Sequence, residues 1–382
     1  MPSVTVVLGT RPEAIKLAPV ILAARASPSM AVTVCNTGQH ADMTAGILSL
    51  FGIVPDIDLA VMKPNQSLTD ITGAVLRTLE PVLGERRPDW LIVQGDTTSA
   101  FAAALAAFYA RTPVAHVEAG LRTGDIHAPW PEEMNRLLIT DIARLHFAPL
   151  ESNAANLQRE GVPPARIVVT GNTGIDALKW IIGRLAADKR LAESAQRALD
   201  ATKVDALRAG AGAQIVLITG HRRESFGEGF RNICAALAEL ARRFPERHFI
   251  YPVHPNPEVR DTVQRELGGM LANLHLIEPL DYLPFVLLMT RAELILTDSG
   301  GIQEEAPSIG KRVIVLRQIT ERTEGVETGL IRLAGTDRAR IVADAAAAFE
   351  GRWPPKPEGS DVYGDGRAAE RIVAALAAVS RT

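Results

Sequence analysis

The sequence predicts an α/β fold of two Rossmann-like, doubly wound domains that face a central cleft. Three observations predict it: the length of 382 residues, the alternation of short apolar runs with helical stretches, and a restart of that alternation in mid-chain. A chain of this length exceeds one ordinary hydrophobic core and suits two. Runs that are apolar throughout are typical of parallel strands covered by helices on both faces.

The first half of the chain contains the first set of alternating elements. Five apolar runs are predicted as strands: Val4–Leu8, Val32–Asn36, Trp90–Gln94, Pro113–Val117 and Ile167–Thr170. Helical stretches separate them, among them Glu13–Arg25, Ser67–Leu83 and Ser99–Tyr109. This β-α-β order predicts an N-terminal domain over residues 1–180.

The second half repeats the pattern after a change of composition. Residues 181–212 are rich in Ala, Arg, Lys, Asp and Gly, so a helix and a linker are expected there. Further strands are predicted at Gln214–Thr219, His248–Val253, Leu274–Ile277, Glu293–Thr297 and Arg312–Leu316. They predict a C-terminal domain over residues 213–365. The Ala-rich end, residues 366–382, predicts a helix that packs back on the N-terminal domain.

Composition excludes several classes of function. The net charge of -3 argues against nucleic acid or an anionic membrane as a partner. Two distant cysteines, Cys35 and Cys234, predict no disulfide framework and fit a reducing cytosol. No signal peptide is expected, and the small-apolar run Ala100–Ala110 is shorter than the ~20 residues that cross a bilayer. The eight histidines show no metal-ligand spacing, so no metal is expected.

The turn Gly9–Glu13 offers a first candidate binding site. A glycine turn that opens a helix presents free N–H groups to an anion, and Arg11 and Lys16 add charge-assisted contacts. The alternative is an ordinary helix start with solvated cations. The dinucleotide fingerprint G-x-G-x-x-G is absent from this turn, which argues against a simple NAD enzyme.

Three acids follow predicted strands or open a helix in the first half. Asp96 and Glu118 each follow a strand, and Glu132 opens a helix, so the three are expected to converge on one pocket. Neighbouring carboxylates repel one another, so at least one pKa is expected to rise, which suits proton transfer. The alternatives are an N-cap role for Asp96 and surface acids at a helix start, the interpretation given to Glu133.

The second half supplies candidate phosphate ligands. His221, between a strand end and two arginines, is a candidate anion ligand. Ser299 with the amides of Gly300 and Gly301 forms a predicted diphosphate cradle at a helix start. Of the next acids, Glu305 could accept the two hydroxyls of a ribose, and Glu304 could instead face solvent; spacing alone does not separate the two. Phe285 and Met289 have the spacing of core residues.

Together these segments resemble the non-hydrolysing UDP-N-acetylglucosamine 2-epimerases of bacteria. Six motifs match in order and spacing: Gly9–Lys16, Gln94–Thr98, His116–Thr123, Pro129–Glu133, Gly220–Glu224 and Asp298–Glu305. Each motif is weak alone, and six in sequence are specific. The resemblance covers almost the whole chain. It implies the two-domain fold shared with glycosyltransferases of the B type, a homodimer, no dissociable cofactor, and a product used for cell-surface polysaccharides.

The resemblance also implies a reaction and roles for residues. UDP is eliminated across carbons 1 and 2, a bound 2-acetamidoglucal remains, and UDP adds back to give UDP-N-acetylmannosamine. Asp96, Glu118 and Glu132 match the acid/base groups, and Arg11, Lys16 and His221 match the cations on the diphosphate. Ser299, Gly300 and Gly301 match the phosphate site. Glu305 matches the ribose ligand, Arg322 the nucleotide side, and Phe285 the uracil contact.

The chain departs from that family at three places. Thr323 stands where the family usually has Pro, Ala41 and Asp42 follow Gly-Gln-His where many members have Arg, and Asn65 stands where many have Arg. The last two places resemble the site at which a second substrate molecule activates the enzyme. We therefore expect activation by UDP-N-acetylglucosamine to be weak or altered.

Three other functions fit the same residues. A hydrolysing epimerase would release free N-acetylmannosamine and UDP. A glycosyltransferase would need an acceptor pocket, and the three acids favour proton transfer instead. A nucleotide-sugar-binding protein without activity would not need those acids.

Overall fold

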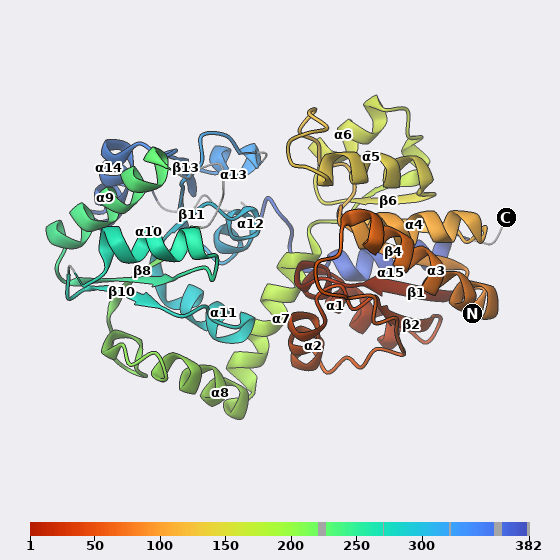
Figure 1. The fold of residues 1–382 in the computed structure, drawn as a ribbon, viewed down its shortest axis with the longest axis horizontal. Coiled ribbons are helices and arrows are strands. Elements are labelled where there is room, and N and C mark those ends of the chain that lie inside the picture. Colours follow the sequence, from red (N-terminus) through yellow and green to blue (C-terminus); the bar gives the residue numbers. More distant parts are fainter. Residues whose placement is uncertain (221–226, 270, 321, 355–360, 380–382) are drawn as a thin grey trace. The chain divides into compact units, whose positions relative to one another are not determined.

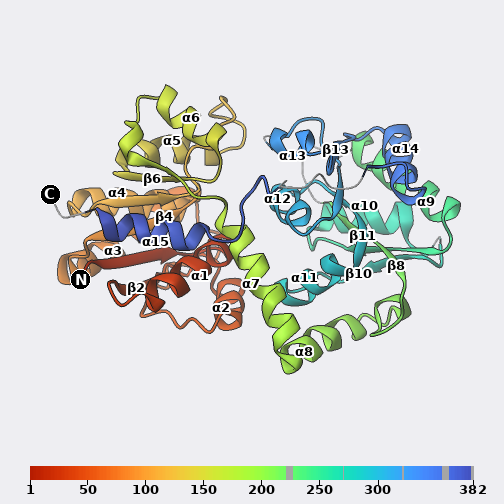
Figure 2. The ribbon, with the colours of Figure 1, turned by 180° about the vertical axis from the view of Figure 1, so that it is seen from behind.

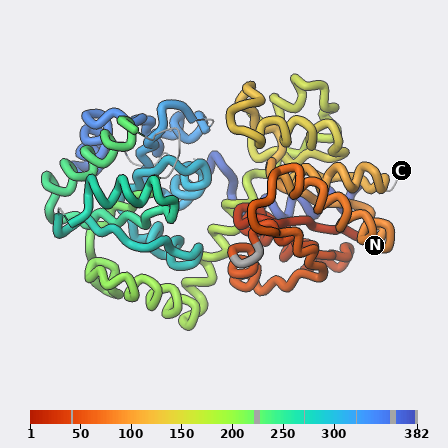
Figure 3. Tube along the Cα trace, in the orientation of Figure 1, coloured from red at the N-terminus to blue at the C-terminus, as the bar shows by residue number. Residues whose placement is uncertain are grey.

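The computed structural model describes residues 1–220, 227–269, 271–320, 322–354 and 361–379, and for residues 41 and 42 the backbone alone. The chain divides into two compact units. Unit 1 comprises Met1–Lys179 and Tyr363–Thr382, and unit 2 comprises Trp180–Val362. The chain leaves unit 1 along one helix, α7 (Thr173–Ala187), and re-enters it at Tyr363, as the green and blue parts of the trace in Figure 3 show.

Unit 1 is built around a parallel sheet, part of which is labelled in Figure 1. Its described residues form seven strands in the order β3-β2-β1-β4-β5-β6-β7. The strands are β1 (Ser3–Leu8), β2 (Ala31–Asn36), β3 (Ile57–Asp58), β4 (Trp90–Gln94), β5 (Val114–Val117), β6 (Leu145–Ala148) and β7 (Ile167–Val169). The strand order reverses direction between β1 and β4. The carboxyl ends of strands at such a switch point are the common ligand site of open α/β sheets.

Helices cover this sheet because its central strands are apolar on both faces. All residues of β4 and β5 are buried. The helices are α1 (Arg11–Ala26), α2 (Ala41–Leu50), α3 (Leu68–Arg86), α4 (Thr98–Tyr109), α5 (Glu132–Ile142), α6 (Glu151–Arg159) and α15 (Ala368–Ala378), with a 3-10 turn at Pro164–Arg166. The buried alanines of α4, among them Ala103 and Ala107, let α3 and α5 pack closely on either side.

The last helix belongs to unit 1 although it follows unit 2 in the sequence. In Figure 2 the blue helix α15 lies among the red and orange elements, and it packs against α1. The backbone N–H of Ala369 donates to the buried Asp176 carboxylate on α7 at 2.8 Å. The N–H of Asn172 donates to the Tyr363 carbonyl at 2.9 Å. The returning chain is therefore tied to the start of α7.

Unit 2 repeats the architecture, and its described residues form six parallel strands in the order β10-β9-β8-β11-β12-β13. The strands are β8 (Gln214–Thr219), β9 (Arg247–Pro252), β10 (Leu274–Ile277), β11 (Ala292–Thr297), β12 (Arg312–Val315) and β13 (Ile331–Leu333). The helices are α8 (Lys189–Asp200), α9 (Glu228–Arg243), α10 (Pro257–Leu267), α11 (Tyr282–Arg291), α12 (Gly300–Ser308), α13 (Thr323–Glu327) and α14 (Arg338–Phe349), with a 3-10 turn at Asp205–Leu207. The direction reverses between β8 and β11.

The predicted fold class, two Rossmann-like α/β domains, is confirmed. Strands β3, β6 and β13 were not predicted; they are two, four and three residues long, and each pairs with a neighbouring strand. Residues 189–207, within the segment expected to be a helix and a linker, form α8 and a 3-10 turn. Leu199 and Leu207 there are fully buried, and α8 packs against α11 of unit 2.

Candidate active site

In the turn between β1 and α1, the backbone of Gly9 lies close against the Thr37 side chain. A Cβ added at Gly9 would lie 1.9 Å from the Thr37 hydroxyl oxygen, so only glycine fits there. The N–H groups of Gly9 and Thr10 donate to the carboxylate of Glu13, at 2.8 and 2.7 Å. Arg11 follows as the first residue of α1 and is half-buried.

Asp96 lies in the turn between β4 and α4, and this turn is held from several elements. Its carboxylate accepts hydrogen bonds from Arg136 of α5, at 2.5 Å from Nη2 and 3.1 Å from Nε. Its backbone carbonyl accepts from Asn135 at 2.9 Å. The preceding carbonyl, of Gly95, accepts from Nε2 of His116 at 2.7 Å. A carbonyl only accepts, so His116 carries its proton on Nε2.

The pKa of Asp96 is raised, as expected for one of the three acids. Burial is the largest cause, Arg136 lowers the pKa, and Glu118 raises it again by repulsion. Repulsion between acids therefore contributes less than the sequence suggested. The structure also corrects the N-cap alternative: Thr97, not Asp96, caps α4, and its hydroxyl accepts from Ala100 N–H at 3.0 Å.

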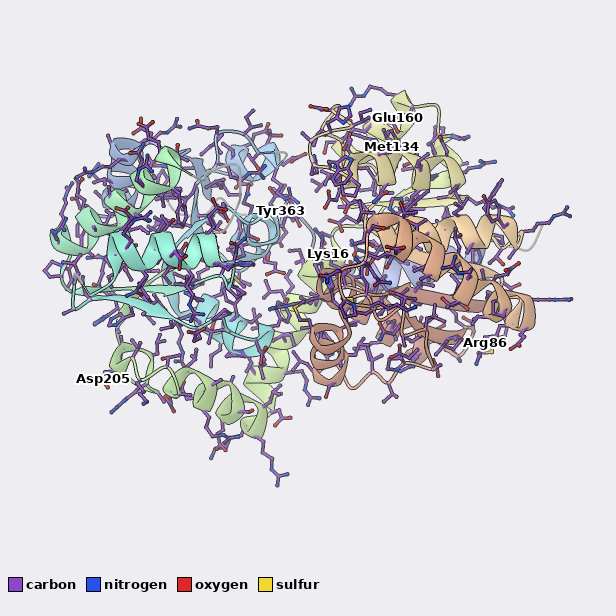
Figure 4. The ribbon with its side chains drawn as sticks, in the orientation of Figure 1. Lys16, Arg86, Met134, Glu160, Asp205 and Tyr363 are labelled. Atoms are coloured by element: carbon purple, nitrogen blue, oxygen red, sulfur yellow. The ribbon has the colours of Figure 1, made fainter. Side chains whose placement is uncertain are left out.

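Glu118 follows β5 and forms an ion pair with Lys16 of α1, 2.5 Å between Nζ and Oε1. Lys16 is labelled in Figure 4. The other carboxylate oxygen of Glu118 accepts from the Gln94 amide at the end of β4. The backbone of Glu118 is left-handed, with φ of 64°. This conformation is uncommon for residues other than glycine and often marks functional sites. Only 18% of the Lys16 side chain and 12% of the Glu118 side chain are exposed.

Glu132 and Glu133 differ although both open α5. Glu132 is half-buried and is the first residue of α5. One turn further along the same helix, Arg136 binds the Asp96 carboxylate. Glu133 is 1% exposed, which overturns its interpretation as a surface acid. It accepts from the N–H groups of Thr123 and Gly124, both at 3.0 Å, and pairs with Arg136 at 2.8 Å. Glu133 thus fixes the loop before α5.

In unit 2, Ser299, Gly300 and Gly301 lie where β11 turns into α12. Ser299 is the N-cap residue of α12, and its N–H donates to the Thr297 hydroxyl at 3.0 Å. A Cβ added at Gly300 would lie 2.8 Å from Cζ of Arg322, so the guanidinium rests against this turn. Gly301 has open space at its Cβ position.

The two acids of α12 are distinguished by their surroundings. Glu304 is 8% exposed and pairs with Arg322 at 2.8 Å, so the alternative in which it faces solvent is wrong. Glu305 is half-buried. On α11, Met289 is fully buried as expected of a core residue, whereas Phe285 is only half-buried and keeps part of its ring accessible.

His221 and the arginines beside it lie outside the described residues. The structure places the residue before them. Gly220 directly follows β8, and its carbonyl accepts from the buried Tyr251 hydroxyl at 2.8 Å. A Cβ at Gly220 would lie 3.7 Å from the Asp298 carboxylate, so the ends of β8 and β11 are adjacent.

Four residues of unit 1 that the sequence did not single out as site residues contact a predicted acid or the residue next to one. They are Glu13, Gln94, His116 and Arg136. The spacing of Thr10 and Glu13 is that of a capping box and marks Glu13 as a helix-start residue. No local pattern marks Arg136, because its partner Asp96 lies 40 positions earlier.

A cavity of about 870 Å³ lies apart from these groups, at the amino-terminal ends of β4 and β5 and opposite Asp96 and Glu118. Its arginines Arg87, Arg111 and Arg144 follow the ends of α3, α4 and α5, where cations offset the negative helix ends. Within the described residues, no three His, Cys, Asp or Glu side chains are grouped as metal ligands, and no helix has the length and apolarity to cross a membrane.

Known proteins match this chain over almost its whole length. The family model described as UDP-N-acetylglucosamine 2-epimerase matches residues 22–377. The UDP-N-acetylglucosamine 2-epimerase of Salmonella typhimurium is 51% identical over 378 residues, 98% of each chain. The Neisseria meningitidis UDP-GlcNAc 2-epimerase bound to UDP-GlcNAc is 44% identical, with a TM-score of 0.88 over 98% of this chain and 99% of that one. The S. aureus MnaA–UDP structure is 40% identical, with a TM-score of 0.84 over 98% and 95%.

Proposed function

The chain belongs to the UDP-N-acetylglucosamine 2-epimerase family, and from that premise we propose that it is the non-hydrolysing type. It interconverts UDP-N-acetylglucosamine and UDP-N-acetylmannosamine. The observation that carries the proposal is the group of acids at the carboxyl edge of the unit 1 sheet, with Asp96 and Glu118 each held by a cation. Related structures with bound UDP-GlcNAc and UDP support the choice of ligand.

The proposed reaction proceeds by elimination and re-addition. The bond between carbon 1 and the diphosphate oxygen breaks, a base takes the proton from carbon 2, and UDP and 2-acetamidoglucal remain bound. An acid then returns a proton to the opposite face of carbon 2 while the UDP oxygen bonds again to carbon 1. The carbon 2 proton is weakly acidic, so it leaves readily only as positive charge develops at carbon 1.

Unit 1 supplies the proton chemistry in this proposal. Asp96, Glu118 and Glu132 are the acid/base groups, and the raised pKa of Asp96, caused chiefly by burial, favours its role in proton transfer. Lys16 lies 2.5 Å from Glu118. In the proposal the same cation stabilises negative charge on departing UDP. Arg11 adds a second cation to the leaving diphosphate.

Unit 2 supplies nucleotide binding in this proposal. The N-terminus of α12 offers N–H groups of Gly300 and Gly301 to the diphosphate, with the Ser299 hydroxyl beside them. Arg322 contacts the nucleotide, and Glu305 accepts from the ribose hydroxyls. On the neighbouring helix, the accessible part of Phe285 packs on uracil. His221 completes the diphosphate site.

The test is proton NMR of the purified protein with UDP-N-acetylglucosamine in deuterated water, without added metal or NAD. UDP-N-acetylmannosamine with deuterium at carbon 2 is the expected product. Free N-acetylmannosamine with UDP would assign the protein to the hydrolysing type. Intact substrate without deuterium would refute epimerisation and point to a transferase or a binding protein.

We also propose a homodimer in the cytoplasm that needs no dissociable cofactor. The exposed aromatic pair at the end of α4, Phe108 and Tyr109, supports association, because large apolar side chains are seldom left together in water. Both cysteines are buried and free, which fits a reducing compartment. Light scattering coupled to size-exclusion chromatography is expected to give twice the chain mass.

A further inference from the structure

The carboxylate of Glu13 joins two turns at the edge of the unit 1 sheet. One oxygen accepts from the N–H groups of Gly9 and Thr10, in the turn after β1. The other accepts from the Thr97 hydroxyl at 2.5 Å, in the turn after β4. The side chain is 1% exposed, so these bonds form away from competing water.

We propose that Glu13 is a positioning residue, which fixes the turn that carries Asp96 against the turn that carries Arg11. The inference rests on the proposed epimerase chemistry, in which Asp96 transfers a proton and Arg11 binds the leaving diphosphate. Both oxygens of Glu13 are engaged by the protein. It therefore acts through these turns and not on the substrate.

Thr97 transmits this effect to Asp96. Its hydroxyl oxygen already accepts from Ala100 N–H at the start of α4, so its O–H is left to donate to Glu13. Asp96 immediately precedes Thr97 in the chain. A displaced Thr97 therefore displaces Asp96, and an error of about 1 Å in a reacting group can cost roughly 100-fold in rate.

The start of α1 does not by itself require a carboxylate. A glutamine at this position of a capping box serves as well as a glutamate, because its carbonyl oxygen accepts the same N–H groups. Burial raises the pKa of the Glu13 carboxyl and its hydrogen bonds lower it, with burial the larger effect. A buried amide costs less to desolvate than a carboxylate. What the carboxylate adds is a second acceptor oxygen, and that oxygen bonds Thr97.

The test is the near-isosteric variant Glu13→Gln, assayed by deuterium entry at carbon 2 of UDP-N-acetylglucosamine. The new amide presents a donor to Thr97 in place of an acceptor. We expect kcat to fall roughly 10- to 100-fold, with KM and UDP affinity unchanged because the N–H groups of Gly9 and Thr10 keep their acceptor.

The chain offers a matched control in a second capping box. Asp70 holds the same position at the start of α3 and accepts from the Ser67 N–H at 3.0 Å, far from the acids in the sequence and exposed. Asp70→Asn should leave kcat unchanged. A fall in both variants would assign the Glu13 effect to a weakened helix and overturn the proposal.

Thr97 variants test the same link from the other side. Thr97→Val should lower kcat and Thr97→Ser should restore most of it, because serine keeps the hydroxyl. The double variant Glu13→Gln/Thr97→Val should be no slower than the slower single variant. If the losses in the two single variants multiply in the double variant, or if Glu13→Gln has wild-type kcat, the proposal is overturned.

If Glu13→Gln does not fold, the Thr97 variants are sufficient by themselves: equal rates for Thr97→Val and Thr97→Ser overturn the proposal. A wild-type protein that incorporates no deuterium instead refutes the proposed function.

Discussion

The two sheets of this protein place different chemical groups at the same topological position. In unit 1, the edge after β4 and β5 presents carboxylates that cations hold: Asp96 with Arg136, and Glu118 with Lys16. In unit 2, the edge after β11 presents a glycine turn and the N-terminus of a helix, with Arg322 against Gly300. Both edges lie where the strand order reverses.

The difference indicates how one fold serves two tasks. A helix N-terminus binds an anion through backbone dipoles, and these do not gain or lose protons in the pH range in which the protein works. Proton transfer needs side chains whose pKa the surroundings can shift, and in unit 1 burial and Arg136 act in opposite directions on Asp96. In unit 2 the buried acid Glu304 pairs with Arg322, the arginine that rests against the glycine turn. We therefore expect variants of unit 1 to change the chemical step and variants of unit 2 to change binding.

The largest effect is expected from Asp96→Asn. The amide cannot transfer a proton, so kcat for epimerisation should fall by about 10²- to 10⁴-fold, while UDP affinity measured by calorimetry stays unchanged. Glu193→Gln, at an exposed position of α8, is the control and should match wild type in both. A loss of UDP affinity as large as the loss of kcat would contradict the proposal that unit 1 carries the chemical step and unit 2 binds the nucleotide.

Acid is expected to destabilise unit 1 before unit 2. Burial lowers the pKa of His116 to about 3 and that of His146 to about 4, from 6.5. The unfolded chain therefore binds these protons first as pH falls, so stability is full above about pH 7 and is lost below it. At pH 5 each histidine removes roughly 2 kcal/mol of unfolding free energy.

Hydrogen exchange with mass spectrometry at pH 7 and pH 5 measures this loss separately in peptides of each unit. His116→Asn should reduce the pH dependence of unit 1, and His127→Asn, at an exposed loop position, should not. Equal losses of protection in the two units would contradict the assignment to these histidines.

A smaller effect is expected from Gly300→Ala in unit 2. The new methyl group would lie 2.8 Å from Cζ of Arg322 and force the guanidinium to move. The guanidinium ends a flexible side chain and can move, so the protein should still fold, but Arg322 loses the position proposed for contact with the nucleotide. UDP affinity should therefore fall roughly tenfold, while kcat at saturating substrate changes little. Gly84→Ala, where a Cβ meets open space in α3, is the control for adding a methyl group to a helix. Unchanged UDP affinity in Gly300→Ala would contradict the proposed contact between Arg322 and the nucleotide.

The sequence was most informative where function follows from strand order. Long apolar strands predicted both sheets, and the rule that sites follow strand ends selected Asp96 and Glu118. It failed where a residue's role depends on a distant partner. Glu133 was interpreted as a surface acid, yet it is buried and accepts from the N–H groups of Thr123 and Gly124 in the loop before α5. Glu304 is buried against Arg322, 18 positions away. Local spacing carries no information about such pairs, because tertiary packing brings them together.

The smallest expected effect concerns activation by a second substrate molecule. Asn65 has left-handed backbone, with φ of 57°, which asparagine adopts more readily than arginine. Without arginine at this position and after Gly38-Gln39-His40, binding of a second anionic nucleotide-sugar loses charge-assisted contacts. Reverse-direction rates with UDP-N-acetylmannosamine alone should therefore be hyperbolic, with little stimulation by added UDP-N-acetylglucosamine. An absolute requirement for UDP-N-acetylglucosamine would show that other residues bind the activator. Restoring the cation by Asn65→Arg should increase the stimulation, although the strained backbone limits the gain.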